Sequence, residues 1–147
     1  MPVRKNLMFA TSYSNAADAG LLLLRVFTGL SLAIAHGWDK VPPSARFVSR
    51  VGEMGLPAPE LFAWLAALAE FGGGLLLAAG LFTRPVALFV VAHFVVVVTL
   101  AHAGDPFGTR EKPLLFGFVA LLFVLTGPGR YSLDALLNRR RAVHEIA

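Results

Sequence analysis

Long apolar stretches separated by short polar segments dominate the pattern along the chain. Four of them, each about 17–23 residues long, cover residues 18–37, 59–81, 84–102 and 110–126. A helix rises ~1.5 Å per residue, so each stretch can cross a hydrocarbon core of ~30 Å, the fourth only just. None alternates apolar and polar residues as a membrane β-strand does. The pattern therefore predicts an all-α integral membrane protein, an antiparallel four-helix bundle that forms a single membrane domain over residues 1–147.

Turn-forming residues mark the ends of these stretches. Gly80 and the segment Thr83-Arg84-Pro85 leave a very short link between the second and third stretches, which indicates a tight antiparallel hairpin of helices. Thr109 is a suitable N-cap for the fourth helix. Gly127-Pro128-Gly129 is expected to end that helix, because glycine accepts a left-handed backbone and proline cannot continue a helix.

Two polar segments are predicted to form short amphipathic helices at the membrane surface. In the first outer loop, Ser44 can cap a helix that has Phe47 and Val51 on its apolar side. In the C-terminal tail, residues 131–147, Ser132 can cap a helix that has leucines on its membrane side and arginines facing outward.

Composition supports a membrane location and excludes several functions. The 147 residues are 56% apolar and only 15% charged, against ~45–50% and ~25% in soluble domains, so the excess apolar surface must face lipid. The chain has no cysteine, which excludes disulfide chemistry and Fe–S ligation. The net charge is +4, yet the tight basic cluster from Arg139 to Arg141 directly follows an apolar region and has no interleaved aromatic residues. This favours anionic lipid headgroups over nucleic acid as its partner.

The distribution of basic residues favours cytoplasmic termini. Four spans place both termini on one side of the membrane, with seven basic residues there against five on the other side. One alternative is a cleavable signal peptide, because Arg4 and Lys5 precede an apolar run that contains Ala33-Ile34-Ala35. A long polar segment comes first, however, and Arg25 interrupts the apolar run, so we expect the first span to be retained.

Three ionisable residues, Arg25, Glu70 and His93, lie well inside predicted spans, away from the span ends. A charged group there costs at least ~2–3 kcal/mol, so each should face protein or water rather than lipid. Glu70 shares its helix face with alanines and glycines, which permits close packing, and Arg25 lies on the same face of the first span as His36. Two interpretations stay open: a charged, proton-exchanging cavity, or an ion pair of Arg25 with Glu70 that fixes helix register. For His93, a core histidine bonded to a backbone carbonyl is favoured over a role in a site.

A second polar group is predicted at the outer rim of the bundle. It comprises His36, Asp39, Lys40, His102, Asp105 and Glu111. Histidine and carboxylate suit transition metals, which makes His36, His102 and Asp105 candidate ligands, but the spacing matches no metal motif and a hydrated loop surface is favoured. His93 and His102 are nine residues apart, half a turn out of phase on one helix. We therefore expect that they do not share a site or hold a haem between them.

Six short motifs follow one another in order between residues 18 and 135. They are Leu24-Arg25, His36-Gly37-Trp38-Asp39-Lys40, Gly55-Leu56-Pro57, Ala69-Glu70-Phe71-Gly72-Gly73-Gly74-Leu75-Leu76-Leu77, Gly80-Leu81-Phe82-Thr83-Arg84 and Gly127-Pro128-Gly129-Arg130-Tyr131-Ser132-Leu133-Asp134. In order and spacing this set resembles the DoxX-like family of small membrane proteins. The resemblance implies a four-helix protein of the bacterial inner membrane with a connection to quinone, since the family is named for a subunit of a quinone-linked oxidoreductase. It assigns no role to individual residues.

Two functions from different classes are consistent with this sequence. As a subunit of a quinone-linked oxidoreductase, the bundle would bind quinone at a polar site made of Arg25, His36, Lys40, Glu70 and His93, with Glu70 or His36 as the catalytic proton carrier. The electrons would come from a bound metal or from a soluble or membrane redox partner. As a non-catalytic anchor or assembly scaffold for a soluble oxidoreductase, the chain would use Arg25 and Glu70 as structural contacts. A solute carrier is less favoured, because four short spans would have to form a homo-oligomer.

Overall fold

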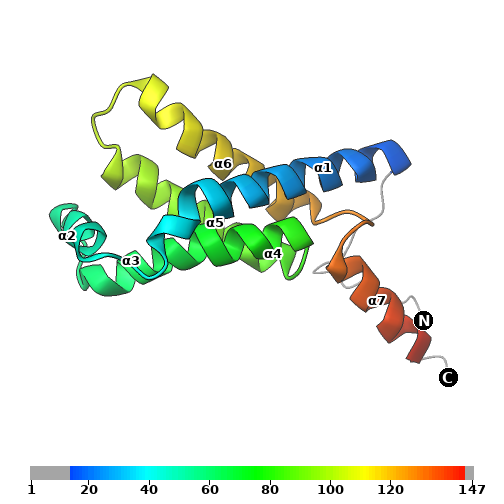
Figure 1. Cartoon of the computed structure of the whole chain (residues 1–147). Helices are drawn as coiled ribbons and strands as arrows, with labels where there is room; N and C mark the ends of the chain where they lie inside the picture. The colour runs from blue at the N-terminus through cyan, green and yellow to red at the C-terminus, as the bar shows by residue number, and fades with distance from the viewer. Residues whose placement is uncertain (1–13, 145–147) are drawn as a thin grey trace.

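The computed structural model describes residues 14–144, with side chains up to Arg139, and over this range every regular element is helical (Figure 1). The α-helices are α1 (Asn15–Leu32), α2 (Ala45–Glu53), α3 (Pro59–Ala67), α4 (Gly73–Ala79), α5 (Thr83–Val96), α6 (Phe107–Thr126) and α7 (Leu133–His144). They are continued by the π-helical segments η1 (Ala33–Gly37), η3 (Leu68–Gly72) and η4 (Val97–Ala101) and by a 3-10 turn, η2 (Trp38–Lys40). The predicted all-α class is confirmed.

Within the described residues, these elements join into three long apolar helices. They run over Asn15–Lys40, Pro59–Ala79 and Thr83–Ala101 and are long and apolar enough to cross a membrane. The first three predicted spans are therefore confirmed as membrane-capable helices. Each contains one π-helical segment, a local widening of the helix that often accompanies functional sites.

The helix α6 corresponds to the fourth predicted span and packs along α5. It has 20 residues, but Arg110, Glu111 and Lys112 lie near its start and shorten its apolar part. It is therefore not among the three membrane-capable helices found in the described chain. The helix begins at Phe107, because the extended backbone of Pro106 provides its N-cap, and the predicted Thr109 cap is wrong. It ends where predicted, at Gly127, whose φ is 76°.

The helices α1 and α4 approach closely because two glycines face each other. A Cβ atom on Gly29 would lie 2.5 Å from the carbonyl oxygen of Gly74, and one on Gly74 would lie 2.6 Å from the carbonyl oxygen of Gly29. Further along, Gly37 leaves room for the backbone of Phe71. The small-residue face around Glu70 therefore packs tightly against the first long helix, as such faces do between membrane helices.

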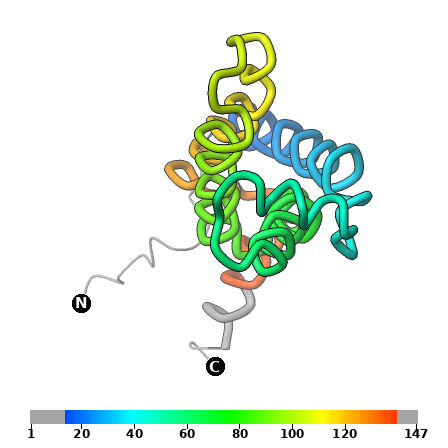
Figure 2. Tube along the Cα trace, turned by 90° about the vertical axis from the view of Figure 1, so that its left-hand side faces the viewer, coloured from blue at the N-terminus to red at the C-terminus, as the bar shows by residue number. Residues whose placement is uncertain are grey.

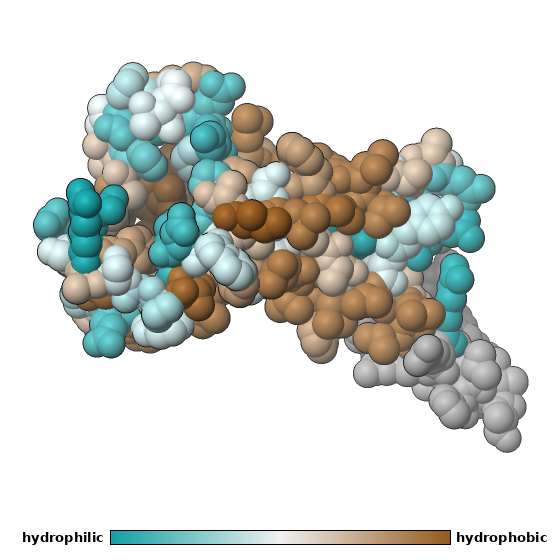
Figure 3. Space-filling model, in the orientation of Figure 1, coloured by the Kyte–Doolittle hydropathy of each residue, from teal (hydrophilic) through white to brown (hydrophobic). Residues whose placement is uncertain are grey.

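The sides of the bundle are apolar, whereas its two ends are polar (Figure 3). Large side chains on the sides are exposed, among them Phe27 at 74%, Leu125 at 69% and Phe118 at 66%. Contiguous apolar surface of this kind is solvated by lipid rather than water. We name the two ends after the helices found there. The α2 end also holds the start of α3 and the α5–α6 connection, and the α7 end holds the start of α1 and the α4–α5 turn (Figures 1 and 2).

Serine caps begin both short helices, as predicted. The Oγ atom of Ser44 accepts a hydrogen bond from the N–H of Phe47 at 3.3 Å, at the start of α2. The Oγ atom of Ser132 accepts one from the N–H of Ala135 at 3.1 Å, at the start of α7. The helix α2 then packs against α3, whereas α7 extends away from the other end of the bundle (Figure 1).

Candidate functional site

A buried carboxylate, that of Glu70, lies at the centre of the candidate site. Glu70 is in η3, midway along the second long helix, and its side chain is only 5% exposed. Its Oε1 atom lies 2.9 Å from Nε2 of His93 on α5. Its Oε2 atom accepts a hydrogen bond from Nζ of Lys40 in η2. One carboxylate thus joins the three long helices, and we call Lys40, Glu70 and His93 the Glu70 cluster.

The π-helical segments explain how Lys40 reaches this carboxylate. The segments η1 and η3 lie side by side. Because Gly37 has no side chain, it can lie directly against the backbone of Glu70 and Phe71. Lys40 follows three residues later in the 3-10 turn, close enough for its ammonium group to bind the carboxylate. Close backbone packing therefore places the charged pair.

Arg25 does not contact Glu70, so of the two interpretations left open by the sequence, the ion pair of Arg25 with Glu70 is wrong. The guanidinium of Arg25 donates to the carbonyl oxygens of Pro128 at 2.9 Å and Tyr131 at 2.8 Å, at the α7 end. Side chains on a helix point back toward its N-terminus, and here the N-terminus of α1 lies at the α7 end. The spacing of residues predicts which face of the helix Arg25 occupies but not the direction of its side chain along the helix axis.

The prediction for His93 also needs correction. A backbone carbonyl was the favoured partner, but the ring bonds the Glu70 carboxylate instead, with a side chain that is only 9% exposed. A carboxylate that faces a histidine across two packed helices can orient its ring and exchange a proton with it. His93 therefore belongs to the site.

The Glu70 cluster borders a cavity of about 1050 Å³ at the α2 end. The other polar side chains on its wall are those of His36, Asp39, Ser44, Arg50, His102, Thr109 and Lys112. The large apolar ones are those of Phe47, Val51, Met54, Leu56, Phe62, Leu65, Phe89, Phe94, Val96, Val97 and Phe116. In Figure 3 the surface at this end is hollowed, with polar residues around the hollow. A broad apolar wall with a few polar groups is typical of a site for a small organic molecule.

Four of the five predicted site residues border this one cavity, namely His36, Lys40, Glu70 and His93, whereas Arg25 does not. The ring of His36 stands edge-on to that of Phe116, with 5.4 Å between the ring centroids. The ammonium group of Lys40 lies 5.4 Å from the centroid of the Phe47 ring and so links α2 to the cluster.

The apolar side of α2 is the part of the site that sequence reasoning missed. Phe47, Val51 and Met54 line the cavity. Helical spacing predicts that Phe47 and Val51 share one apolar face, but it predicts that this face lies at the membrane surface. Periodicity shows which residues share a face and leaves open what the face contacts.

At the outer rim, His102 joins the cavity and pairs with Asp105. Its Nδ1 atom lies 2.9 Å from Oδ2 of Asp105. His93 and His102 border the same cavity, contrary to expectation, because η4 is π-helical and His102 has left helical geometry, with a φ of −114°. Among the described residues, no group of three or more histidine, aspartate or glutamate side chains is arranged to hold a metal ion.

Comparison with known proteins identifies the family. The sequence model of the DoxX family matches residues 20–103. The chain belongs to the DoxX family. The inner membrane protein YqjF of Escherichia coli is 35% identical over 127 residues, covering 84% of this chain and 95% of the relative. The inner membrane protein YphA of the same organism is 29% identical over 128 residues, covering 81% and 91%.

A relative from Bacillus subtilis carries a name that mentions an activity. It is called "Putative oxidoreductase CatD" and is 31% identical over 118 residues, covering 80% of this chain and 86% of the relative. No solved structure matches the chain.

The motifs that resemble the DoxX family gather at the two ends of this member. His36-Gly37-Trp38-Asp39-Lys40 and the segment around Glu70 meet beside the cavity at the α2 end. Leu24-Arg25 meets the run from Gly127 to Asp134 at the α7 end. The fold therefore brings the motifs together into two polar centres.

Proposed function

We propose that this DoxX-family protein is a membrane subunit of a quinone-linked oxidoreductase system and binds a quinone headgroup in the cavity beside Glu70. One observation carries the proposal: a buried carboxylate, bonded to both a lysine and a histidine, borders a cavity of about 1050 Å³ with aromatic and aliphatic walls. The name of the Bacillus subtilis relative supports the oxidoreductase part of the proposal.

The size and chemistry of the cavity suit a quinone. Organic ligands commonly occupy pockets of ~300–1000 Å³, so this cavity has room for a headgroup and the first part of an isoprenoid tail. The rings of Phe47 and Phe116 offer apolar surface to a planar headgroup. His36, Lys40 and His93 are the hydrogen-bond donors that would bind its oxygen atoms.

The Glu70 cluster would supply protons. Reduction of a quinone to a quinol consumes two electrons and two protons. Nε2 of His93 and Oε1 of Glu70 lie 2.9 Å apart, a hydrogen-bond distance across which a proton can be transferred directly. His36 on the cavity wall is the second proton carrier. The electrons would come from a redox partner, soluble or membrane-bound, that carries a flavin or a metal centre.

We further propose that α6 is the fourth span of an antiparallel bundle in the inner membrane, with cytoplasmic termini and with α2 and α7 at the two membrane surfaces. Large apolar side chains on α6, such as Leu115, Phe118 and Leu125, are exposed and suited to lipid. The relatives YqjF and YphA of Escherichia coli are named inner membrane proteins. In this orientation the quinone cavity would open toward the outer face.

Quinone titration of the purified full-length protein tests the proposal. The ring of Trp38 lies 5.7 Å from that of Phe71, the neighbour of Glu70, so quenching of tryptophan fluorescence by decyl-ubiquinone or menadione reports occupancy of the cavity. We expect saturable binding that Glu70→Gln weakens about tenfold, the effect of losing a charge-assisted hydrogen-bond network. Glu60→Gln is the matched control, because Glu60 is exposed on α3 and does not line the cavity.

An absence of saturable quinone binding by the parent protein would refute the proposal. The second function, a non-catalytic anchor for a soluble oxidoreductase, would then be tested by co-purification from the native membrane. If the chain is such an anchor, a soluble redox enzyme should co-purify with it, and the Glu70→Gln variant should retain this enzyme.

A further inference from the structure

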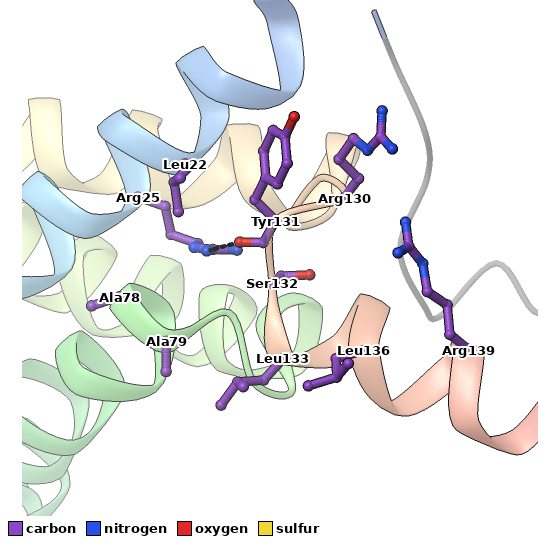
Figure 4. A pocket seen from close by; sticks show the side chains of 10 residues that line it. All are labelled: Leu22, Arg25, Ala78, Ala79, Arg130, Tyr131, Ser132, Leu133, Leu136 and Arg139. Atoms are coloured by element: carbon purple, nitrogen blue, oxygen red, sulfur yellow. Dashed lines mark hydrogen bonds between the residues drawn. The ribbon is translucent and has the colours of Figure 1, made fainter. Parts of the chain in front are cut away.

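A second cavity, of about 410 Å³, lies at the α7 end and takes no part in the proposed quinone chemistry. It is open to the surface and is lined by residues of α1, the end of α4, the segment after α6 and α7 (Figure 4). Arginines from three separate segments lie on its wall, namely Arg25, Arg130 and Arg139. Leu22, Leu133 and Leu136 form an apolar wall beside them. The cavity is therefore both cationic and apolar.

Arg25 carries a buried positive charge that lacks a paired anion. It is 1% exposed, and its Nε atom has no hydrogen-bond partner. Its two bonded nitrogens donate to the carbonyls of Pro128 and Tyr131, and among the described residues no carboxylate lies within ion-pair distance of it. Asp134 attracts Arg25 electrostatically, but both of its carboxylate oxygens accept from backbone N–H groups, at 2.8 and 2.9 Å. An uncompensated buried cation favours an anionic ligand.

The other two arginines on the cavity wall are more exposed than Arg25. Arg139 is exposed on α7 and forms no hydrogen bond or ion pair with the described residues. The guanidinium of Arg130 lies 5.5 Å from the centroid of the Tyr131 ring and bonds the side chain of Asn15. In Figure 4 Arg25 lies on one side of the Tyr131–Ser132 segment and Arg130 and Arg139 lie on the other, with Leu133 and Leu136 below. Arg139 is therefore free to bind a ligand that Arg25 attracts.

We propose that this cavity binds an anionic phospholipid, with its phosphate at the arginines and the start of an acyl chain along the leucines. Basic pockets between membrane helices bind anionic headgroups in this way. The wall of the cavity combines these arginines with apolar side chains of α1 and α7 (Figure 4). Leu133 and Leu136, exposed at 42% and 46%, give the acyl chain a surface beside the phosphate. Inorganic phosphate would satisfy the arginines but would leave this apolar wall uncovered.

Native mass spectrometry of the full-length protein in detergent tests this site. We expect retention of added phosphatidylglycerol in preference to phosphatidylcholine. Arg139→Gln should lower the affinity for phosphatidylglycerol about fivefold, the effect of one basic residue at an anionic lipid. Ala79→Phe should lower it too, because Ala79 lines the cavity and a phenyl ring would fill it without changing charge. Arg46→Gln removes the same charge from an exposed site on α2 and should leave retention unchanged.

The proposal makes three further outcomes decisive. Equal retention of the two lipids, or an equal loss in Arg46→Gln and Arg139→Gln, would overturn it in favour of general surface attraction. Displacement of phosphatidylglycerol by an equal concentration of inorganic phosphate would overturn the role of the leucines. Circular dichroism checks the fold of each variant, and Arg25 is left intact because it holds the segment after α6.

Discussion

Replacing Arg25 by methionine should destabilise the bundle by about 2–4 kcal/mol. A hydrogen bond to a charged group contributes about 1.5–3 kcal/mol, and Arg25 makes two, at 2.9 and 2.8 Å. Pro128 is buried, so its carbonyl would lose its partner without gaining water, whereas Tyr131 is 45% exposed and can be rehydrated. Methionine keeps the apolar part of the side chain. It also removes the cost of burying a charge, and this offsets part of the stability lost with the two hydrogen bonds.

Reversible unfolding in mixed dodecyl maltoside and SDS micelles, followed by circular dichroism, measures this loss. Arg25→Lys should have an intermediate stability, because one ammonium group cannot reproduce the two-pronged contact of a guanidinium. Arg46→Met is the control, since Arg46 is exposed on α2, and should stay within ~0.5 kcal/mol of the parent. If Arg25→Met were as stable as this control, the segment after α6 would not depend on Arg25 and the reasoning would be refuted.

Three other experiments test separate contacts. In the same unfolding assay, Gly74→Ala should lower the free energy of unfolding by about 1–3 kcal/mol, because the added Cβ would meet the backbone of Gly29, which cannot move aside. An unchanged midpoint would contradict the close packing of α1 and α4. Asp134→Ala should lower the free energy of unfolding by about 1–2 kcal/mol, the usual effect of losing a helix cap, because it removes the acceptor for two N–H groups at the start of α5. A variant as stable as the parent would show that Asp134 does not act as this cap. The double variant Lys40→Met and Glu70→Gln should lose less stability than the sum of the losses in the two single variants, because each single change leaves the other side chain without its partner. Strictly additive losses in thermal unfolding would show that the pair is uncoupled.

The hydropathy of the sequence is sufficient to predict the three long helices, because a long apolar segment forms a helix in lipid regardless of which other helices pack against it. It was less informative for α6, where Arg110, Glu111 and Lys112 shorten the apolar run. The small-residue face around Glu70 was also predicted correctly, since Gly74 leaves space that only a closely packed helix can fill.

The partners of the charged residues could not be predicted in the same way. An ideal helical wheel fixes the angle of a side chain around the axis, but Arg25 also has a direction along the axis, and it points away from Glu70. The helical wheel also assumes a rotation of 100° per residue, which places His93 and His102 on different faces. The π-helical segment η4 departs from this rotation, and the two residues border the same cavity. The contact of Lys40 with Glu70 depends on a backbone approach at Gly37, which lies 33 residues from Glu70 in the sequence.

The two polar centres differ in the kind of partner that each charged group has, and this difference separates their roles. Glu70 is bonded to Lys40 and His93, two side chains that can gain or lose a proton. Arg25 is bonded to backbone carbonyls, which do not titrate, and a guanidinium keeps its proton in proteins. Proton exchange can therefore reside at the α2 end, whereas Arg25 at the α7 end can contribute a fixed charge alone. A fixed charge suits the binding of a lipid phosphate and the fastening of a chain segment, and it follows that substitutions at Arg139 should alter lipid retention without altering quinone binding.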